Sequence, residues 1–208
     1  MADVRPFKGL LFDPDVVGPM EHVICPPYDV IDFQTQEQLY KRNRYNVVRL
    51  EEGKIELSDD DVENRYTRSA EHLRLWIEEA ALVRDEIPSY YLVRHGFKVG
   101  NGFKHRLGLV AAVRLERYEK GSVIPHEYTR SGPKADRLAL MEKCHANISH
   151  IMLLYRDSQN TILQMLASAT TETLVFNFKD SDNQTFEVWR IMDPPQIKFI
   201  SDMLADKP

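Results

Sequence analysis

The chain has 208 residues, of which 43% are apolar and 28% are charged, and its formal net charge is −5. This composition is typical of a globular protein with a substantial core, and the negative charge argues against nucleic acid or an anionic membrane as a partner. No apolar run approaches the roughly 20 residues that a membrane-spanning helix requires. The two cysteines, Cys25 and Cys144, form neither a disulfide scaffold nor a zinc-finger spacing, so we expect reduced thiols and a cytoplasmic location.

The first quarter of the chain is predicted to alternate between extended and helical structure. Residues 4–12 are predicted to form a strand, and residues 13–30 a loop interrupted by several prolines. Asp32 is expected to cap a helix over residues 33–42. Residues 45–50 are rich in β-branched side chains, which predicts a second strand.

Two consecutive prolines make part of the first loop stiff. Pro26 and Pro27 have fixed φ angles and restrict the residues before them. Because a stiff loop holds its side chains in place, the next two residues, Tyr28 and Asp29, are candidate site residues.

The longest predicted helix covers residues 59–81, and Ser58 with Asp61 resembles a capping box at its start. Further along the chain we expect a helix that ends near residue 146, a buried strand over residues 148–155, and a helix that Ser158 caps and that ends near residue 169. Strands over residues 173–179 and 185–192 are predicted to form a second hairpin, and a last helix is predicted from Asp193 to Leu204.

A Gly-Asn-Gly turn predicts a hairpin between strands over residues 90–97 and 103–115. Residues 107–113 are apolar on both faces, so we expect this strand to lie centrally in its sheet. Hairpins mixed with single helices predict an α+β fold with a mixed β-sheet, and without a clear linker we expect one domain.

The most distinctive segment is the charged stretch over residues 125–138, which opens a helix. Ser131 or Gly132 can cap that helix, and Pro133 suits its first turn. A helix start carries unpaired N–H groups and the positive end of the dipole, which favour an anion. Three cations are predicted to gather there and to bind phosphate oxygens: Arg130, Lys134 and Arg137.

Neighbouring side chains add chemistry to this predicted anion site. Thr129 supplies a hydroxyl donor, and His126 or Glu127 can move a proton. Glu127 and Asp136 can hold Mg²⁺ against a phosphate, because it prefers oxygen ligands. The implied ligand is a small phosphorylated molecule or a nucleotide, with ATP or ADP and Mg²⁺ as the candidate cofactor. We expect no metal site built from the protein alone, because the histidines lack metal-ligand spacing.

A second interpretation stays open, in which these charges form a solvated surface paired with neighbouring carboxylates. The nucleophile elbow, the dinucleotide fingerprint and the P-loop are all absent from the sequence. The charged stretch is therefore the main source of functional predictions.

The chain also resembles a widespread prokaryotic family catalogued as a domain of unknown function, number one thousand and fifteen in its series. The resemblance rests on five motifs: Arg5-Pro6-Phe7, Pro26-Pro27-Tyr28-Asp29-Val30, Tyr45-Asn46, His126-Glu127-x-Thr129-Arg130 and Lys134-x-Asp136-Arg137-Leu138. It implies that the matching positions, Asn46 among them, form a phosphate-binding half-site.

This family is similar to the ParB/sulfiredoxin superfamily, which includes nucleotide-binding proteins and a free-serine kinase. Its members usually have about twice this length, with an Ala-Asp-Gly-His-His-Arg signature in the second half that is missing here. The resemblance thus implies either the N-terminal half of a longer architecture, with the C-terminal half as a partner, or a short natural form that lost the other half. The leading hypothesis is a phosphate- or nucleotide-binding protein, with a phosphotransferase as its enzymatic form. The alternative is a non-catalytic interaction or regulatory domain.

Overall fold

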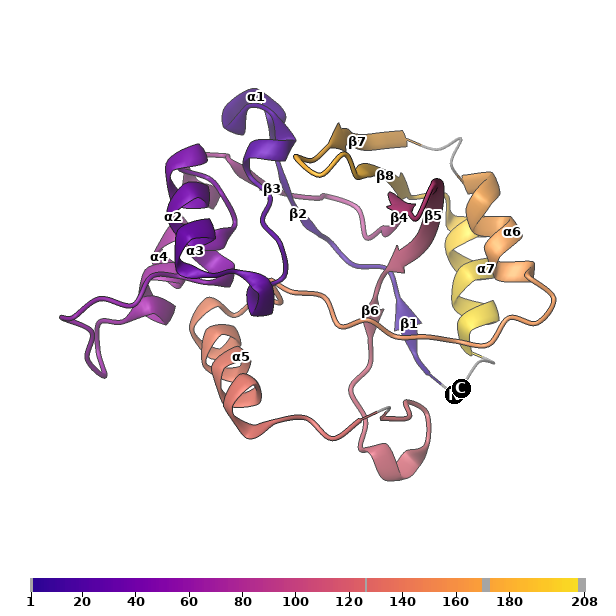
Figure 1. The fold of residues 1–208 in the computed structure, drawn as a ribbon. Coiled ribbons are helices and arrows are strands. Elements are labelled where there is room, and N and C mark those ends of the chain that lie inside the picture. Colours follow the sequence, from indigo (N-terminus) through magenta and orange to yellow (C-terminus); the bar gives the residue numbers. More distant parts are fainter. Residues whose placement is uncertain (1, 126, 170–172, 206–208) are drawn as a thin grey trace. The chain divides into compact units, whose positions relative to one another are not determined.

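A computed structural model describes residues 2–125, 127–169 and 173–205 of the chain. Helices and antiparallel strands occur together (Figure 1), which confirms the α+β class. The chain forms two compact units. Unit 1 combines residues 1–9, 84–126 and 152–208, and unit 2 combines residues 10–83 and 127–151. The expectation of one domain stays a prediction.

Unit 1 is built on a four-stranded sheet with the strand order β5-β4-β8-β7. These strands are β4 (Tyr90–Val99), β5 (Gly102–Val110), β7 (Thr173–Lys179) and β8 (Thr185–Ile191). Both predicted hairpins are confirmed, and their ladders are antiparallel, which corrects the mixed arrangement. The prediction that residues 107–113 lie centrally is wrong, because β5 is an edge strand whose leucines pack on the core from one face only.

Two helices, α6 (Thr161–Ser168) and α7 (Pro194–Ala205), lie side by side in Figure 1 and supply the rest of this core. Their apolar faces pack on inward-facing sheet residues; the cluster includes Leu92, Trp189, Ile162, Leu166, Ile191 and Ile200. The Asp157 carboxylate, rather than Ser158, accepts hydrogen bonds from the N–H groups that start α6.

The strand predicted over residues 4–12 is divided into β1 (Val4–Arg5) and β2 (Leu10–Phe12). Proline between them cannot donate to a ladder, which interrupts the pairing. Gly9 then donates its N–H to the Tyr91 hydroxyl at 2.9 Å. A Cβ atom at Gly9 would lie 2.7 Å from that oxygen, so the close approach requires glycine. In the same unit, β1 pairs with β6 (Ala112–Val113).

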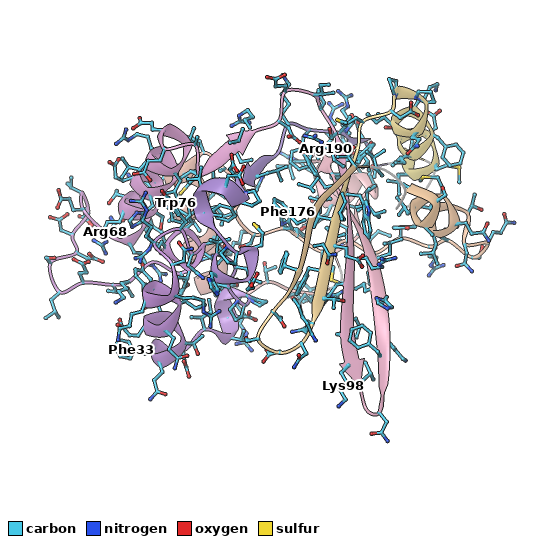
Figure 2. The ribbon with its side chains drawn as sticks, turned by 90° about the horizontal axis from the view of Figure 1, so that it is seen from above. Phe33, Arg68, Trp76, Lys98, Phe176 and Arg190 are labelled. Carbon is cyan, nitrogen blue, oxygen red and sulfur yellow. The ribbon has the colours of Figure 1, made fainter. Side chains whose placement is uncertain are left out.

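Unit 2 is mainly helical. Its elements after β2 are α1 (Pro14–Val17), the 3-10 turns η1 (Met20–His22) and η2 (Tyr28–Val30), α2 (Phe33–Arg42), α3 (Val48–Glu51), α4 (Arg65–Glu78), β3 (Leu82–Arg84) and α5 (Ser131–Cys144). The core contains Val23, Leu50, Leu73, Trp76 and Leu140. Figure 2 shows Phe33 and Arg68 at the outer edge of this unit, away from Trp76. The helix over residues 33–42 and its Asp32 cap are confirmed.

Two predictions in unit 2 are wrong because side chains bond to the nearby backbone. The strand predicted over residues 45–50 is instead a turn followed by α3, since the Asn43 side chain accepts from Tyr45 N–H and the Asn46 side chain from Val48 N–H. The long helix begins at Arg65 instead of residue 59, because Asn64 forms the capping box that Ser58 was expected to supply.

The buried strand predicted over residues 148–155 is also wrong. No strand is assigned there, and Ile151 and Leu154 are 83% and 84% exposed. In the described part of the chain no strand pairs with this apolar run, and residues 151–155 are all exposed.

Candidate functional site

The predicted charged stretch contributes Arg137, whose guanidinium group is held by carboxylates in unit 2. Its Nε donates to Asp136 Oδ2 at 2.7 Å. Its Nη1 donates to the backbone oxygen of Glu51 at 3.0 Å and to Glu51 Oε1 at 3.2 Å. A carboxylate oxygen of Glu52 lies 3.7 Å from Nη2. Arg137 is therefore enclosed by acceptors from α3 and from its own helix.

A second guanidinium group, from Arg65 at the start of α4, completes this cluster. Arg65 Nη1 donates to Glu52 at 2.9 Å, and Nη2 pairs with Asp136. The Tyr66 hydroxyl donates to the same Asp136 oxygen at 2.7 Å. We call these six residues, Glu51, Glu52, Arg65, Tyr66, Asp136 and Arg137, the ion-pair cluster. It holds one more carboxylate than guanidinium groups, so it offers little attraction for a further anion.

The electrostatics of Asp136 follow from this arrangement. Burial alone would raise the pKa of Asp136, but hydrogen bonds from Tyr66 and Arg137, with the charges of both arginines, outweigh it. The pKa of Asp136 therefore lies below its ordinary value, and the side chain is a stable anion at neutral pH. Both of its oxygens already accept from cationic or phenolic donors, so this donor set does not fit Mg²⁺.

The proline-rich loop reaches this cluster through Tyr28. The centre of its ring lies 4.2 Å from Arg137 Cζ, which is a cation–π contact. Asn46 fixes the preceding part of the loop, because its buried amide donates to the backbone oxygens of His22 at 2.7 Å and Ile24 at 2.9 Å. Asn46 thus supports the loop from behind, while Asp29 is exposed.

The other predicted cations lie at the first turn of α5 and point into solvent. Arg130 is the N-cap residue, with extended backbone and no side-chain cap bond, so neither Ser131 nor Gly132 is the cap. Lys134 donates its backbone N–H to the Arg130 oxygen at 3.3 Å. Among the described residues, neither side chain makes an ion pair, and both are exposed.

The remaining predicted residues divide as follows. Thr129 and Glu127 are exposed on the approach to α5, and His126 lies outside the described residues. The structure thus brings Tyr28, Asp136 and Arg137 together and leaves Arg130 and Lys134 as separate exposed cations. Among the described residues, no group of three or more His, Cys, Asp or Glu side chains is arranged to hold a metal ion.

Sequence reasoning missed several members of the site. Glu51 is buried and also accepts a hydrogen bond from the Ser149 hydroxyl. The pattern over residues 45–50 predicts a strand that ends just before Glu51, and that prediction assigns Glu51 no role in the site. The adjacent acidic pair Glu51-Glu52 was the available signal, but nothing in the sequence links it to Arg65.

Cys25 is not a nucleophile in this environment. Burial, together with the nearby carboxylates of Glu51 and Glu52, raises the pKa of its thiol to about 12. The thiolate is the reactive form of cysteine, so Cys25 stays a protonated, weakly reactive group at neutral pH.

Comparison with known proteins agrees with the resemblance seen in the motifs. Residues 4–208 match the family described as "Protein of unknown function (DUF1015)". The chain belongs to this family. Nothing among curated proteins or solved structures matches the chain. None of the helices over residues 2–125, 127–169 and 173–205 has the length and apolar character that a bilayer crossing requires.

Membership in the DUF1015 family places the motif residues in context. Three of the five motifs, those around Tyr28, Asn46 and Arg137, supply residues that meet in unit 2 at the ion-pair cluster or just behind its loop. The family description names no activity.

Proposed function

We propose that the surface around the first turn of α5 binds the phosphate group of a small phosphorylated molecule, with a nucleotide as the leading candidate. The single observation that carries the proposal is the contrast between cations on one helix. Arg137 is enclosed by carboxylates, whereas Lys134, one turn before it, and Arg130, at the N-cap, form no ion pair among the described residues.

The backbone supports the same conclusion. α5 has 14 residues and begins without a side-chain cap, so its first N–H groups are available to a ligand. Those groups and the helix dipole favour negative charge, and two flanking cations add charge-assisted donors. The exposed hydroxyl of Thr129 can serve as a further donor.

The ion-pair cluster has a positioning role in this proposal. It ties α5 to α3 and α4 through Arg137 and Asp136, which fixes the direction of the helix start. The phosphate would contact Arg130 and Lys134, and Arg137 would act through the orientation of the helix.

Calorimetry with inorganic phosphate, ADP and ATP, each with and without Mg²⁺, tests the proposal. Binding should weaken about tenfold for each of Arg130→Ala and Lys134→Ala, because each removes a charge-assisted hydrogen bond. Lys143→Ala removes the same charge from the last turn of α5 and serves as the control. If wild type gives no heat with any ligand, or if the control loses as much affinity as Lys134→Ala, the proposal is wrong.

An enzymatic form of this function would be a phosphotransferase of the serine-kinase type, built on a scaffold distantly similar to the ParB/sulfiredoxin superfamily. Phosphoryl transfer requires mainly positioning and charge stabilisation from the protein. Glu127 would serve as the proton acceptor, His126 would assist it, and the C-terminal half expected from the resemblance would complete the site. Transfer of ³²P from ATP to serine by a chain that includes that half tests this form.

A second candidate function is that of an interaction or regulatory domain. The observation that favours it is the exposed apolar run over residues 151–155, where Met152 is 62% exposed and Leu154 is 84% exposed. Contiguous exposed apolar surface commonly marks a protein contact. Absence of any phosphate binding, together with a stable complex between this chain and the C-terminal half, would favour this function.

A further inference from the structure

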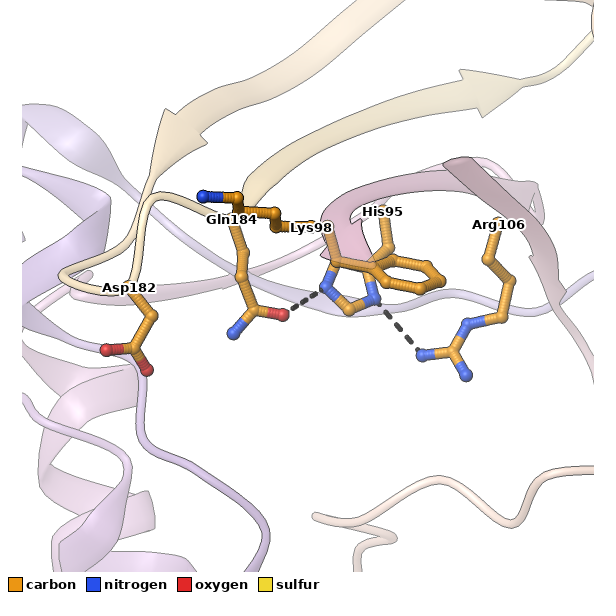
Figure 3. Close-up of a pocket in the computed structure, with 6 residues that line it drawn as sticks. His95, Lys98, Arg106, Asp182 and Gln184 are labelled. Atoms are coloured by element: carbon orange, nitrogen blue, oxygen red, sulfur yellow. Dashed lines mark hydrogen bonds between the residues drawn. The ribbon is translucent and has the colours of Figure 1, made fainter. Parts of the chain in front are cut away.

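A hollow of about 400 Å³ lies at the open end of the sheet in unit 1, between the β4–β5 hairpin and the β7–β8 turn. Its lining consists of His95, Phe97, Lys98, Arg106, Asp182 and Gln184. Figure 3 shows Gln184 and Arg106 on opposite sides of the His95 ring, and Figure 2 places Lys98 near the far end of the hairpin. A volume of this size is within the range of small-molecule sites.

The floor of the hollow belongs to a row of aromatic rings that crosses three strands. The Phe178 and Phe186 rings are stacked with centres 5.2 Å apart, and the Phe186 and His95 rings with centres 4.6 Å apart. Phe97 continues the row, with its ring centre 5.1 Å from that of His95. The stacked faces within the row cover one another, and the partly exposed Phe97 ring at its end is the surface on which a nucleobase can stack.

A chain of hydrogen bonds fixes the polar groups around this floor. The Gln184 amide nitrogen donates to Asp180 at 3.2 Å, which turns the amide oxygen toward His95. His95 Nε2 therefore donates to that oxygen at 2.7 Å, and Arg106 donates to His95 Nδ1 at 3.1 Å. These contacts hold the His95 ring between Gln184 and Arg106.

Two cationic side chains border the hollow, with Lys98 on the Gln184 side of the His95 ring and Arg106 on the opposite side. Among the described residues, neither Arg106 nor Lys98 forms an ion pair, and both are exposed. Arg106 also lies over the Phe97 ring, with Cζ 5.9 Å from its centre. The Asp182 carboxylate stands at the other end of the hollow, where it can accept a hydrogen bond from the edge of a ligand.

We propose that this hollow binds a planar heteroaromatic ring that carries an anionic group, with a mononucleotide as the ligand class. The ring would stack on Phe97, its anionic group would pair with Arg106, and Asp182 would accept from its edge. The site is distinct from the α5 surface and does not rest on it. A polynucleotide is disfavoured because the chain as a whole carries a net charge of −5.

Saturation-transfer NMR and calorimetry with AMP, adenosine and inorganic phosphate test this proposal on the full chain. Wild type should bind AMP, and adenosine about tenfold more weakly, because adenosine lacks the phosphate group that pairs with Arg106. Phe97→Leu keeps apolar bulk but removes the aromatic face, and it should weaken both ligands about tenfold. Arg106→Gln should weaken AMP alone, and it provides a second test if Phe97→Leu does not fold.

Lys198→Ala is the matched control, since it removes an exposed cation from α7 in the same unit. The proposal is overturned if wild type binds neither AMP nor adenosine at millimolar concentration, if Phe97→Leu binds adenosine as wild type does, or if a short oligonucleotide binds more tightly than AMP. Adenosine, which has no phosphate, reports on the ring-binding hollow, and inorganic phosphate, which has no ring, reports on the α5 surface. The two probes therefore distinguish the two proposed sites. The variants Arg130→Ala and Lys134→Ala should leave adenosine binding unchanged.

Discussion

The guanidinium carbon of Arg137 lies 4.2 Å from the centre of the Tyr28 ring. Tyr28 follows two prolines in the first loop of unit 2, and Arg137 lies on α5, the last helix of that unit along the chain. Their contact joins the stiff loop to α5, and the carboxylates around Arg137 hold its guanidinium plane in place.

Replacing Tyr28 by leucine should lower the free energy of unfolding by about 1 kcal/mol, because the cation–π contact with Arg137 is lost. Tyr28→Phe keeps the ring and should be close to wild type. Urea titrations followed by circular dichroism would measure both. Equal losses for phenylalanine and leucine would show that the hydroxyl, and not the ring face, provides the stabilisation.

Asp136→Asn should destabilise the protein by about 2 kcal/mol at pH 7, since it removes a charge that two arginines and a tyrosine contact. The pKa of Asp136 is lowered in the folded state, so its contribution is present above the ordinary carboxylate pKa and is lost as the pH falls through the lowered value. The difference between wild type and variant should therefore shrink toward pH 3. A difference in unfolding free energy that stays constant from pH 7 to pH 3 would contradict this assignment.

Asn46→Ala should cost about 2 kcal/mol, because it leaves the carbonyl oxygens of His22 and Ile24 without their donor. Gln38→Ala, at an exposed position of α2, should change the unfolding free energy by less than about 0.5 kcal/mol. Chemical denaturation of both variants would measure the effect. Equal unfolding free energies for the two variants would contradict the assignment of Asn46 as a stabilising support of the loop.

Both cysteines should react slowly with a disulfide reagent in the folded protein. Burial raises the pKa of Cys144 to about 11, and burial together with two glutamates raises that of Cys25 to about 12. At pH 8 we expect labelling at least about a hundredfold slower than in urea, because the thiolate is the reacting form. The variants Cys25→Ser and Cys144→Ser each keep one thiol, Cys144 in the first and Cys25 in the second. Rapid labelling of either folded variant would show that its remaining thiol is reactive and would contradict the prediction for that cysteine.

Much of the fold was predictable from local patterns. The helix over residues 33–42 has its cap in the adjacent residue, and the hairpin of β4 and β5 has its turn residues between its arms. The failures come from interactions that composition does not show. β-branched residues near Asn46 indicate a strand, but the asparagine side chains bond to the backbone and turn the chain into α3.

The candidate site was predictable in part. The stiff proline loop indicates Tyr28 as a site residue, and the charged stretch indicates Asp136 and Arg137. The structure brings these three side chains together. The partners Glu51 and Arg65 lie on other elements, and only the tertiary fold decides that these charges meet. The same pairing explains why Arg137 is enclosed while Arg130, on the same helix, is exposed.

The ion-pair cluster draws its members from α3, α4 and α5, so the start of α5 acquires its orientation only when all three helices are packed. A synthetic peptide containing the α5 sequence alone should therefore lack the preorganised surface. By mass action, any anion that binds Arg130 and Lys134 in the intact chain would also shift the folding equilibrium toward the native state. Heat resistance of unit 2 would then depend on the phosphate content of the buffer.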